Sequence, residues 1–156
     1  MSTRRTTRAL VDAVQRTGPT LTWSLEVLLE PTSLSPARWQ VLQAVGEAQE
    51  PRTVPYIARN LALSRQAVQR VVNELVAQDL IALGENRHHA TARLLRLTEK
   101  GRECYVECRR IYDGWLSSIR THLEPEDIAE GIAILDKVAG AALNSVRSQL
   151  PDATSP

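Results

Sequence analysis

Four polar residues between positions 64 and 77 have the types and spacing needed to read the edges of nucleic-acid bases. They lie at i, i+3, i+4 and i+7, on one face of a predicted helix, and they are Gln66, Gln69, Arg70 and Asn73. This face carries hydrogen-bond donors and no carboxylate, although a face that only has to be soluble tolerates Asp and Glu. Amide and guanidinium groups pair in bidentate fashion with adenine and guanine in the major groove of DNA. We therefore predict that this face approaches a polyanion.

The opposite side of the same helix has the pattern of a core-facing surface. Its apolar residues recur at i, i+3, i+4, i+7 and i+8, and they are Val68, Val71, Val72, Leu75 and Val76. Ser64 is a suitable N-cap, because its hydroxyl can accept a hydrogen bond from an N–H of the first turn. A short helix from Thr53 to about Leu61 precedes it, separated by a short turn. This order is the helix-turn-helix layout.

The N-terminal part is predicted to be helical with one interruption. Residues 4–29 have apolar residues at helical spacing, but the Gly-Pro pair at 18–19 breaks the pattern. Proline lacks an N–H and disfavours helix at the residue before it, so a broken or kinked helix is expected. The Ser-Pro pair at 35–36 then marks the start of a second helix over about 37–48.

Two strands and two long helices are expected in the C-terminal half. Residues 80–85 and 92–97 are typical of strands, and the polar loop between them predicts a β-hairpin. A helix over about 99–121 follows, and the last helix begins at Pro125, with carboxylates in its first turn, where the helix dipole favours them. Both helices carry apolar stripes without a partner in the middle of the chain, which suggests a homodimer. Residues 151–156 are expected to form a frayed tail.

The composition is that of one soluble globular domain. The chain has 156 residues, of which 43% are hydrophobic and 24% charged, and its net charge is +1. Basic residues exceed acidic ones by nine to six in 31–100, and the balance is six to nine in 101–156, so we expect a polyanion to contact the middle of the chain. No apolar run is long enough for a membrane span and no secretory signal begins the chain, so a cytoplasmic location is expected.

Several segments together resemble the MarR family of bacterial transcription regulators. They are Ser35–Leu42, Thr53–Arg59, Leu63–Arg70 with Asn73–Val76, and Leu97–Gly101. The resemblance implies a mainly α fold with a small β-hairpin wing, in which a winged helix-turn-helix is flanked by N- and C-terminal dimerisation helices. It also implies a homodimer that binds double-stranded DNA at a pseudo-palindromic operator, represses transcription, and releases DNA on binding a small-molecule effector.

The resemblance divides the chain into four parts. Residues 1–34 are expected to form an N-terminal dimerisation helix, 35–98 the DNA-binding domain, 99–150 the C-terminal dimerisation helices, and 151–156 a disordered tail. The predicted DNA contacts lie on the recognition helix, at the helix before it and on the wing, and they are Thr53, Ser64, Arg65, Gln66, Gln69, Arg70, Asn73, Asn86, Arg87, His88 and Arg93.

Two positions depart from the family pattern. The wing has His89-Ala90-Thr91 where related proteins commonly carry two more positive charges, which leaves Arg87 and Arg93 as its candidate contacts. Each lost phosphate contact is expected to flatten the salt dependence of DNA binding. The turn before the recognition helix has Ala62 where glycine is frequent, and if that position has positive φ, alanine strains it by roughly 1 kcal/mol.

Aromatic and cysteine residues offer less specific signals. The candidate effector-binding residues are Trp23, Trp39, Tyr56, Tyr105 and Tyr112, for which ordinary core packing is the alternative interpretation. Cys104 and Cys108 lie one helical turn apart on an apolar stripe, so they are either small core residues or the thiols of a redox-responsive regulator.

No motif of catalysis or metal binding stands out. His88 and His89 are adjacent, and consecutive residues rarely converge on one ion, so no metal and no other cofactor is expected. The sequence has no Ser-His-Asp arrangement, phosphate-binding glycine loop or paired carboxylates, so we do not expect an enzyme. The depleted wing and small net charge leave one more alternative, a winged-helix protein-interaction module that has lost DNA binding.

Overall fold

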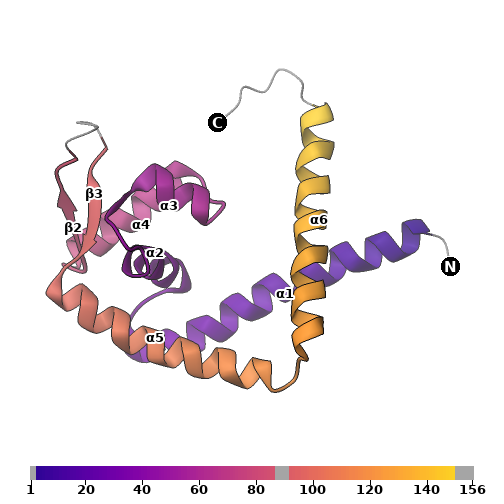
Figure 1. The fold of residues 1–156 in the computed structure, drawn as a ribbon, viewed down its shortest axis with the longest axis horizontal. Coiled ribbons are helices and arrows are strands. Elements are labelled where there is room, and N and C mark those ends of the chain that lie inside the picture. Colours follow the sequence, from indigo (N-terminus) through magenta and orange to yellow (C-terminus); the bar gives the residue numbers. More distant parts are fainter. Residues whose placement is uncertain (1–2, 87–91, 150–156) are drawn as a thin grey trace. The chain divides into compact units, whose positions relative to one another are not determined.

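The computed structural model describes residues 3–86 and 92–149, and over these residues the chain is mainly helical with one small sheet (Figure 1). It groups into two compact units, one formed by 18–114 and the other by 1–17 with 115–156. The first unit holds the helix-turn-helix and the sheet. The second is built from helical segments that belong to the two ends of the chain.

The helices and strands follow the order expected for a winged helix-turn-helix. They are α1 Thr3–Leu29, the 3-10 helix η1 Glu30–Thr32, α2 Pro36–Gly46, β1 Arg52–Thr53, α3 Val54–Asn60, α4 Arg65–Ala77, β2 Ile81–Gly84, β3 Leu94–Leu97, α5 Glu99–Arg120 and α6 Pro125–Gln149. The predicted fold class is therefore confirmed, and the two predicted strands are present with slightly shorter extents.

The β-hairpin carries a third strand on one edge. The strand order is β1-β3-β2 with antiparallel pairing throughout, in which Ile81 of β2 lies opposite Leu97 and Arg52 of β1 lies opposite Leu95. The sequence did not predict β1, because two residues show no alternating pattern and become a strand only through their partner.

The core of the 18–114 unit is formed mainly by α2, α3, α4 and the sheet. The predicted inner face of α4 lies in it, since Val68, Val71, Val72 and Leu75 are buried and Val76 is partly buried. The other buried residues are Leu29, Leu34, Trp39, Val41, Leu42, Val45, Ile57, Ala58, Leu80, Ile81, Leu95 and Cys108. This packing fixes which side of α4 faces solvent.

The predicted break in the first helix is wrong. α1 is continuous from Thr3 to Leu29, with Pro19 inside it. The proline removes the N–H that would donate to the carbonyl oxygen of Gln15, and in the following turn the hydroxyl of Thr22 donates to the carbonyl oxygen of Gly18 at 3.0 Å. The loss of one donor is therefore insufficient to end a helix whose flanking turns keep their own hydrogen bonds.

The turn before α4 has left-handed backbone at Ala62, where φ is 53°. The N–H of Leu63 donates to the carbonyl oxygen of Ala58 at 2.9 Å and the N–H of Ala62 to that of Arg59 at 3.3 Å. These two bonds close the C terminus of α3 around a residue of positive φ. Ala62 thus has the positive φ at which alanine is strained, and its Cβ atom strains the turn by roughly 1 kcal/mol relative to glycine.

The end of α4 is tied to the start of α5 around Leu80. Thr98 donates its N–H to the carbonyl oxygen of Leu80 at 3.2 Å and its hydroxyl to that of Asp79 at 2.6 Å. The N–H of Gly101 in turn donates to the Thr98 hydroxyl at 2.9 Å. A Cβ atom at Gly101 would overlap the Leu80 carbonyl oxygen, so this approach of α5 requires glycine.

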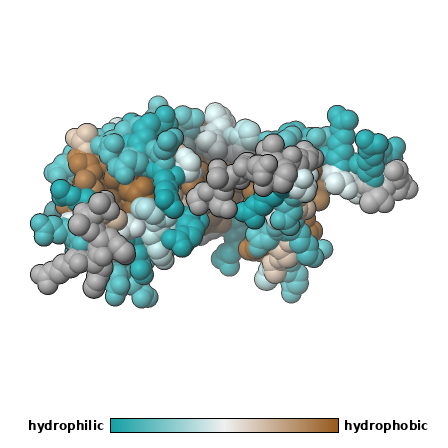
Figure 2. Space-filling model, turned by 90° about the horizontal axis from the view of Figure 1, so that it is seen from above, coloured by the Kyte–Doolittle hydropathy of each residue, from teal (hydrophilic) through white to brown (hydrophobic). Residues whose placement is uncertain are grey.

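The second unit exposes many apolar side chains. Apolar residues reach the molecular surface among hydrophilic ones, as Figure 2 shows. In this unit they include Leu10 and Val11 of α1 and, on α6, Ile128, Ile132, Leu135, Leu143 and Val146. The predicted tail at 151–156 lies outside the described residues.

Candidate nucleic-acid interface

The donor-rich face of α4 is exposed over its whole length. Its four predicted members, Gln66, Gln69, Arg70 and Asn73, face solvent, and so does Arg65. The valines on the opposite side of the helix are buried. Ser64 caps the helix as predicted, because its Oγ accepts a hydrogen bond from the N–H of Ala67 at 3.1 Å. The first turn of α4 contains no acidic residue, so the partial positive charge of the helix N terminus is not offset there.

Two of these side chains are joined to each other. Gln69 Nε2 donates to Asn73 Oδ1 at 2.8 Å, across one turn of α4. Residues four apart on a helix are neighbours, and such amide pairs hold one another in place. The sequence signal for this bond was present in the i, i+4 spacing, but the sequence alone did not indicate which amide donates.

One carboxylate on α4 is held by a neighbouring helix. Arg38 Nε of α2 donates to Glu74 Oε2 at 2.9 Å, and the two side chains are 28% and 39% exposed. Glu74 is also one helical turn from Arg70, with which it could pair. Its carboxylate is instead bound by Arg38 of α2. Arg70 itself forms no ion pair within residues 3–86 and 92–149. The sequence did not predict either partner, because they are 36 positions apart.

A hollow of about 370 Å³ lies between α3, α4 and the sheet. Its lining combines apolar residues with four predicted DNA contacts, and consists of Val54, Pro55, Arg65, Gln66, Gln69, Leu83, Ala92, Arg93 and Leu95. The structure therefore brings Arg93, from the chain segment before β3, to the same hollow as the start of α4. This juxtaposition places two guanidinium groups beside the amide face.

The remaining predicted DNA contacts have mixed outcomes. Thr53 is partly buried at the N-cap of α3, but its side chain makes no capping hydrogen bond. Asn86 joins the two arms of the hairpin on the loop side of β2 and β3, because its Nδ2 donates to the carbonyl oxygen of Ala92 at 3.0 Å. Arg87 and His88 lie outside the described residues.

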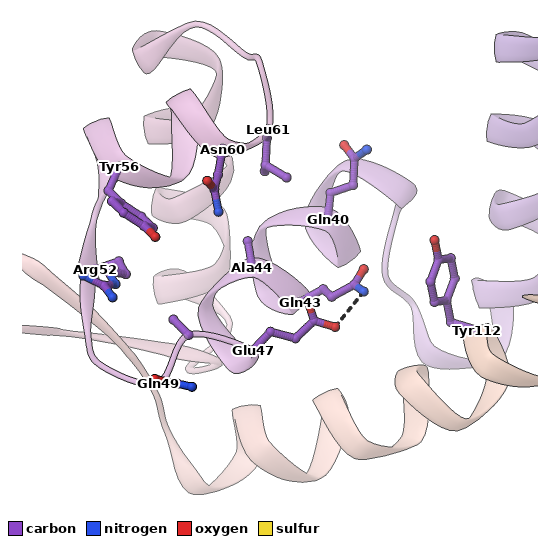
Figure 3. Close-up of a pocket in the computed structure, with 11 residues that line it drawn as sticks. Gln40, Gln43, Ala44, Glu47, Gln49, Arg52, Tyr56, Asn60, Leu61 and Tyr112 are labelled. Carbon is purple, nitrogen blue, oxygen red and sulfur yellow. Dashed lines mark hydrogen bonds between the residues drawn. The ribbon is translucent and has the colours of Figure 1, made fainter. Parts of the chain in front are cut away.

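A larger hollow of about 570 Å³ lies between α2, α3 and α5 (Figure 3). Tyr56 and Tyr112, two of the five predicted effector-binding residues, line it together with Gln40, Gln43, Ala44, Glu47, Ala48, Gln49, Arg52, Asn60 and Leu61. The guanidinium carbon of Arg52 lies 4.6 Å from the centre of the Tyr56 ring, a cation–π arrangement. Gln43 Nε2 donates to Glu47 Oε1 at 3.0 Å, so part of the polar lining is held in place.

The other predicted effector-binding residues do not line this hollow. Trp39 is buried in the core, with its ring centre 6.0 Å from that of Tyr105 and 5.7 Å from that of Tyr112. Trp23 is 65% exposed on α1. Trp39 thus fits the core-packing interpretation, while Tyr105 is partly buried against the core and also lines a separate hollow of about 510 Å³. The outward position of Trp23 was not anticipated.

The two cysteines are poorly suited to react as thiolates. Burial, together with the neighbouring Cys108, raises the pKa of Cys104 to about 12, and burial also raises the pKa of Cys108. Because the thiolate is the nucleophile, both side chains are protonated and weakly reactive at neutral pH. Both pack in or against the core, as expected for small apolar residues.

Neither a membrane-spanning helix nor a metal-binding cluster is found in the described part of the chain. Within it, no helix is both long enough and apolar enough to cross a membrane. Among the same residues, no three His, Cys, Asp or Glu side chains gather in a way that could hold a metal ion. The adjacent histidines of the wing fall outside that range.

Residues 32–90 match the sequence model of the MarR family. Uncharacterized proteins of Mycobacterium tuberculosis and Mycobacterium bovis are 50% identical to this chain over 66 residues, which make up 42% of this chain and 45% of each relative. The chain thus matches these curated relatives over about half of their length.

Solved structures of transcription regulators share the fold. A mutant MarR of E. coli in complex with operator DNA superposes with a TM-score of 0.75 at 18% identity, covering 88% of this chain and 99% of that chain. MarR of Staphylococcus aureus in complex with salicylate and kanamycin gives a TM-score of 0.73 at 17% identity, covering 90% of this chain and 94% of that chain. At these identities the likeness is one of fold.

Proposed function

We propose that this chain, a member of the MarR family through its winged helix at residues 32–90, is a DNA-binding repressor of transcription that acts as a homodimer and releases DNA when a small molecule binds. The recognition helix α4 enters the major groove, and Arg93 of the wing contacts the DNA backbone or the minor groove. The protein acts in the cytoplasm, where its operator is.

The exposed face of α4 is the observation that carries the proposal. Its polar side chains donate hydrogen bonds, and Arg38 neutralises the nearest carboxylate, Glu74. Arg65 and Arg93 add positive charge beside this face. Such a surface suits a polyanion that also presents acceptors in its major groove.

The exposed apolar residues of the second unit support a dimer. Large apolar side chains on α6, such as Ile132 and Leu143 at 57% and 60% exposure, are unusual on a monomer. Burying them against a second copy of the chain by two-fold symmetry removes this surface from water. The same symmetry presents two recognition helices to successive major grooves, about 34 Å apart.

The polar hollow beside Tyr56 and Tyr112 supports a ligand site. Its volume of about 570 Å³ is within the range of small-molecule sites, and it lies between the helix-turn-helix and α5. S. aureus MarR, which shares this fold, was solved in complex with salicylate and kanamycin. A ligand that favours one spacing of the two recognition helices shifts the population toward a state that does not fit the operator.

Gel-shift titration tests DNA binding by the full chain. The probe is the DNA upstream of the protein's own gene, at several salt concentrations, with the double variant Gln69→Ala/Arg70→Ala and the single variant Arg70→Ala. Loss of a base contact by Arg70 should cost ~1–3 kcal/mol of specific binding. Arg110→Ala, an exposed arginine on α5, is the matched control and should bind like the wild type. If the double variant retains full affinity, the assignment of this face is wrong.

A further inference from the structure

We infer that Gln69 and Asn73 act as one unit that reads an adenine in each half of the DNA site, an assignment that rests on the proposed DNA-binding function. Both residues are exposed, and both belong to the donor-rich face of α4. Their side chains are joined by the bond from Gln69 Nε2 to Asn73 Oδ1, at 2.8 Å. This bond distinguishes them from the other polar residues on the face.

The hydrogen bond fixes the direction of the Gln69 amide. A glutamine amide without a partner can turn over and exchange its oxygen and nitrogen, so it can offer either a donor or an acceptor at a given place. Here the nitrogen points to Asn73, and the carbonyl oxygen therefore points away from it. In this arrangement the order of donor and acceptor on the exposed face is already the one that adenine requires.

The groups that remain available match adenine. Gln69 keeps its carbonyl oxygen and one N–H, while Asn73 keeps both of its N–H donors. Adenine presents an acceptor, N7, beside a donor, the N6 amino group. Guanine presents two acceptors, N7 and O6, so the fixed oxygen of Gln69 would meet an acceptor there. A pyrimidine offers only one polar group to this edge.

Nothing else in the described chain competes for these groups. Over residues 3–86 and 92–149, neither the Gln69 nor the Asn73 side chain has a further hydrogen bond. Glu74, the adjacent carboxylate that could accept from an amide, is engaged by Arg38. The amide pair is therefore both oriented and available.

Selection from a random double-stranded DNA library tests the assignment, with sequencing of the DNA bound by each variant of the full chain. The wild type should enrich an adenine in each half-site. Gln69→Ala should weaken that preference about tenfold, the discrimination of one bidentate pair. Asn73→Ala should weaken it at the same base pair, because it releases the Gln69 amide. Asn73→Asp should keep it, because a carboxylate can only accept and so holds Gln69 in the same direction.

Base preference separates this role from a merely structural one. A variant that damages the fold, or that adds negative charge as Asn73→Asp does, lowers affinity for all sequences and leaves the ranking of bases unchanged. The inference is overturned if the base pair that Gln69→Ala weakens is G·C, or if Asn73→Asp loses the preference as fully as Asn73→Ala. If the wild type enriches a motif that Gln69→Ala leaves intact, the inference is overturned but the proposed DNA-binding function stands. A wild type that enriches no sequence overturns the proposed function as well.

Discussion

Arg38 and Glu74 are joined by a hydrogen-bonded ion pair of 2.9 Å that connects α2 to the outer part of α4. Glu74 lies four residues after Arg70, a spacing at which a glutamate and an arginine on a helix also pair. In the structure Glu74 pairs with Arg38 and not with Arg70. As a result the guanidinium of Arg70 is left to face solvent.

Arg38→Ala should therefore weaken DNA binding from a distance. Without its partner on α2, Glu74 turns to Arg70, neutralises it and places a negative charge beside the DNA. Titration of the protein against operator DNA should show lower affinity, because Arg70 is no longer available to read a base and a carboxylate lies beside the DNA. The variant should lose only about 1 kcal/mol of stability, since the pair is partly exposed.

The double variant Arg38→Ala/Glu74→Gln is the control for this competition. It also lacks the ion pair, but it has no carboxylate to capture Arg70. DNA affinity should return toward that of the wild type. If the double variant binds as weakly as Arg38→Ala alone, Arg38 acts by some other route.

Ala62→Gly should stabilise the protein, because φ at this position is 53°. Glycine relieves roughly 1 kcal/mol of strain, and the greater freedom of the unfolded chain offsets part of this gain. We expect a small net increase in the free energy of unfolding, measured by denaturant titration. Ala67→Gly, the same substitution inside α4, should instead destabilise by about 1 kcal/mol. Equal effects at the two sites would contradict the assigned strain.

Gly101→Ala should destabilise the protein strongly. The added Cβ atom would overlap the carbonyl oxygen of Leu80, and the backbone on both sides is held by the bonds of Thr98. We expect a loss of about 3 kcal/mol or more in thermal or denaturant unfolding. Gly114→Ala on the same helix is the matched control, since a Cβ atom there meets nothing within 4 Å. That variant should be neutral or up to about 1 kcal/mol more stable.

Both cysteines should react slowly with thiol reagents in the native protein. Burial raises the pKa of Cys104 from 9.0 to about 12, so its thiol stays protonated as the pH rises past 9 and deprotonates only near 12. Alkylation at pH 8, followed by mass spectrometry, should be far slower in the folded protein than in the same protein in urea. Peroxide at neutral pH should leave DNA binding unchanged. Rapid sulfenic acid formation in the native protein would favour the redox-responsive alternative.

The apolar surface of α6 predicts the oligomeric state. Replacement of Ile132, which is 57% exposed, by Lys should shift a dimer toward monomer, because a charge would be buried at the interface. Sedimentation or light scattering over a range of concentrations measures the shift. Lys137→Ala on the same helix is the control and should leave the dimer intact. A wild-type chain that is monomeric at all concentrations would rule out the dimer.

The sequence predicted the parts of the fold that depend on local periodicity. The valine stripe of α4, the Ser64 cap and the two hairpin strands follow from spacing and residue type, and the structure confirms them. The possible strain at Ala62 was also predicted, because a turn of this kind favours glycine. Such features are determined by residues close together in the chain.

The remaining features depend on partners that local sequence does not identify. β1 exists through its pairing with β3, and the Arg38–Glu74 pair joins positions 36 apart. The aromatic residues predicted to bind an effector do not lie together: Trp39 is buried, Tyr56 and Tyr112 line a hollow, and Trp23 is exposed. Residue type alone does not determine which side of a helix faces a pocket. The wing tip, with Arg87 and His88, stays a prediction.

Hydrogen bonds around Leu80 connect the end of α4 directly to the start of α5. Besides the contacts of Thr98, Lys100 Nζ donates to the carbonyl oxygen of Gln78 at 2.9 Å. The start of α5 is therefore hydrogen-bonded to the three residues 78–80 that follow α4. We expect a displacement of the start of α5 to move α4 with it, because these bonds join the two segments directly. The direction of the exposed polar face of α4 would then follow the position of the start of α5.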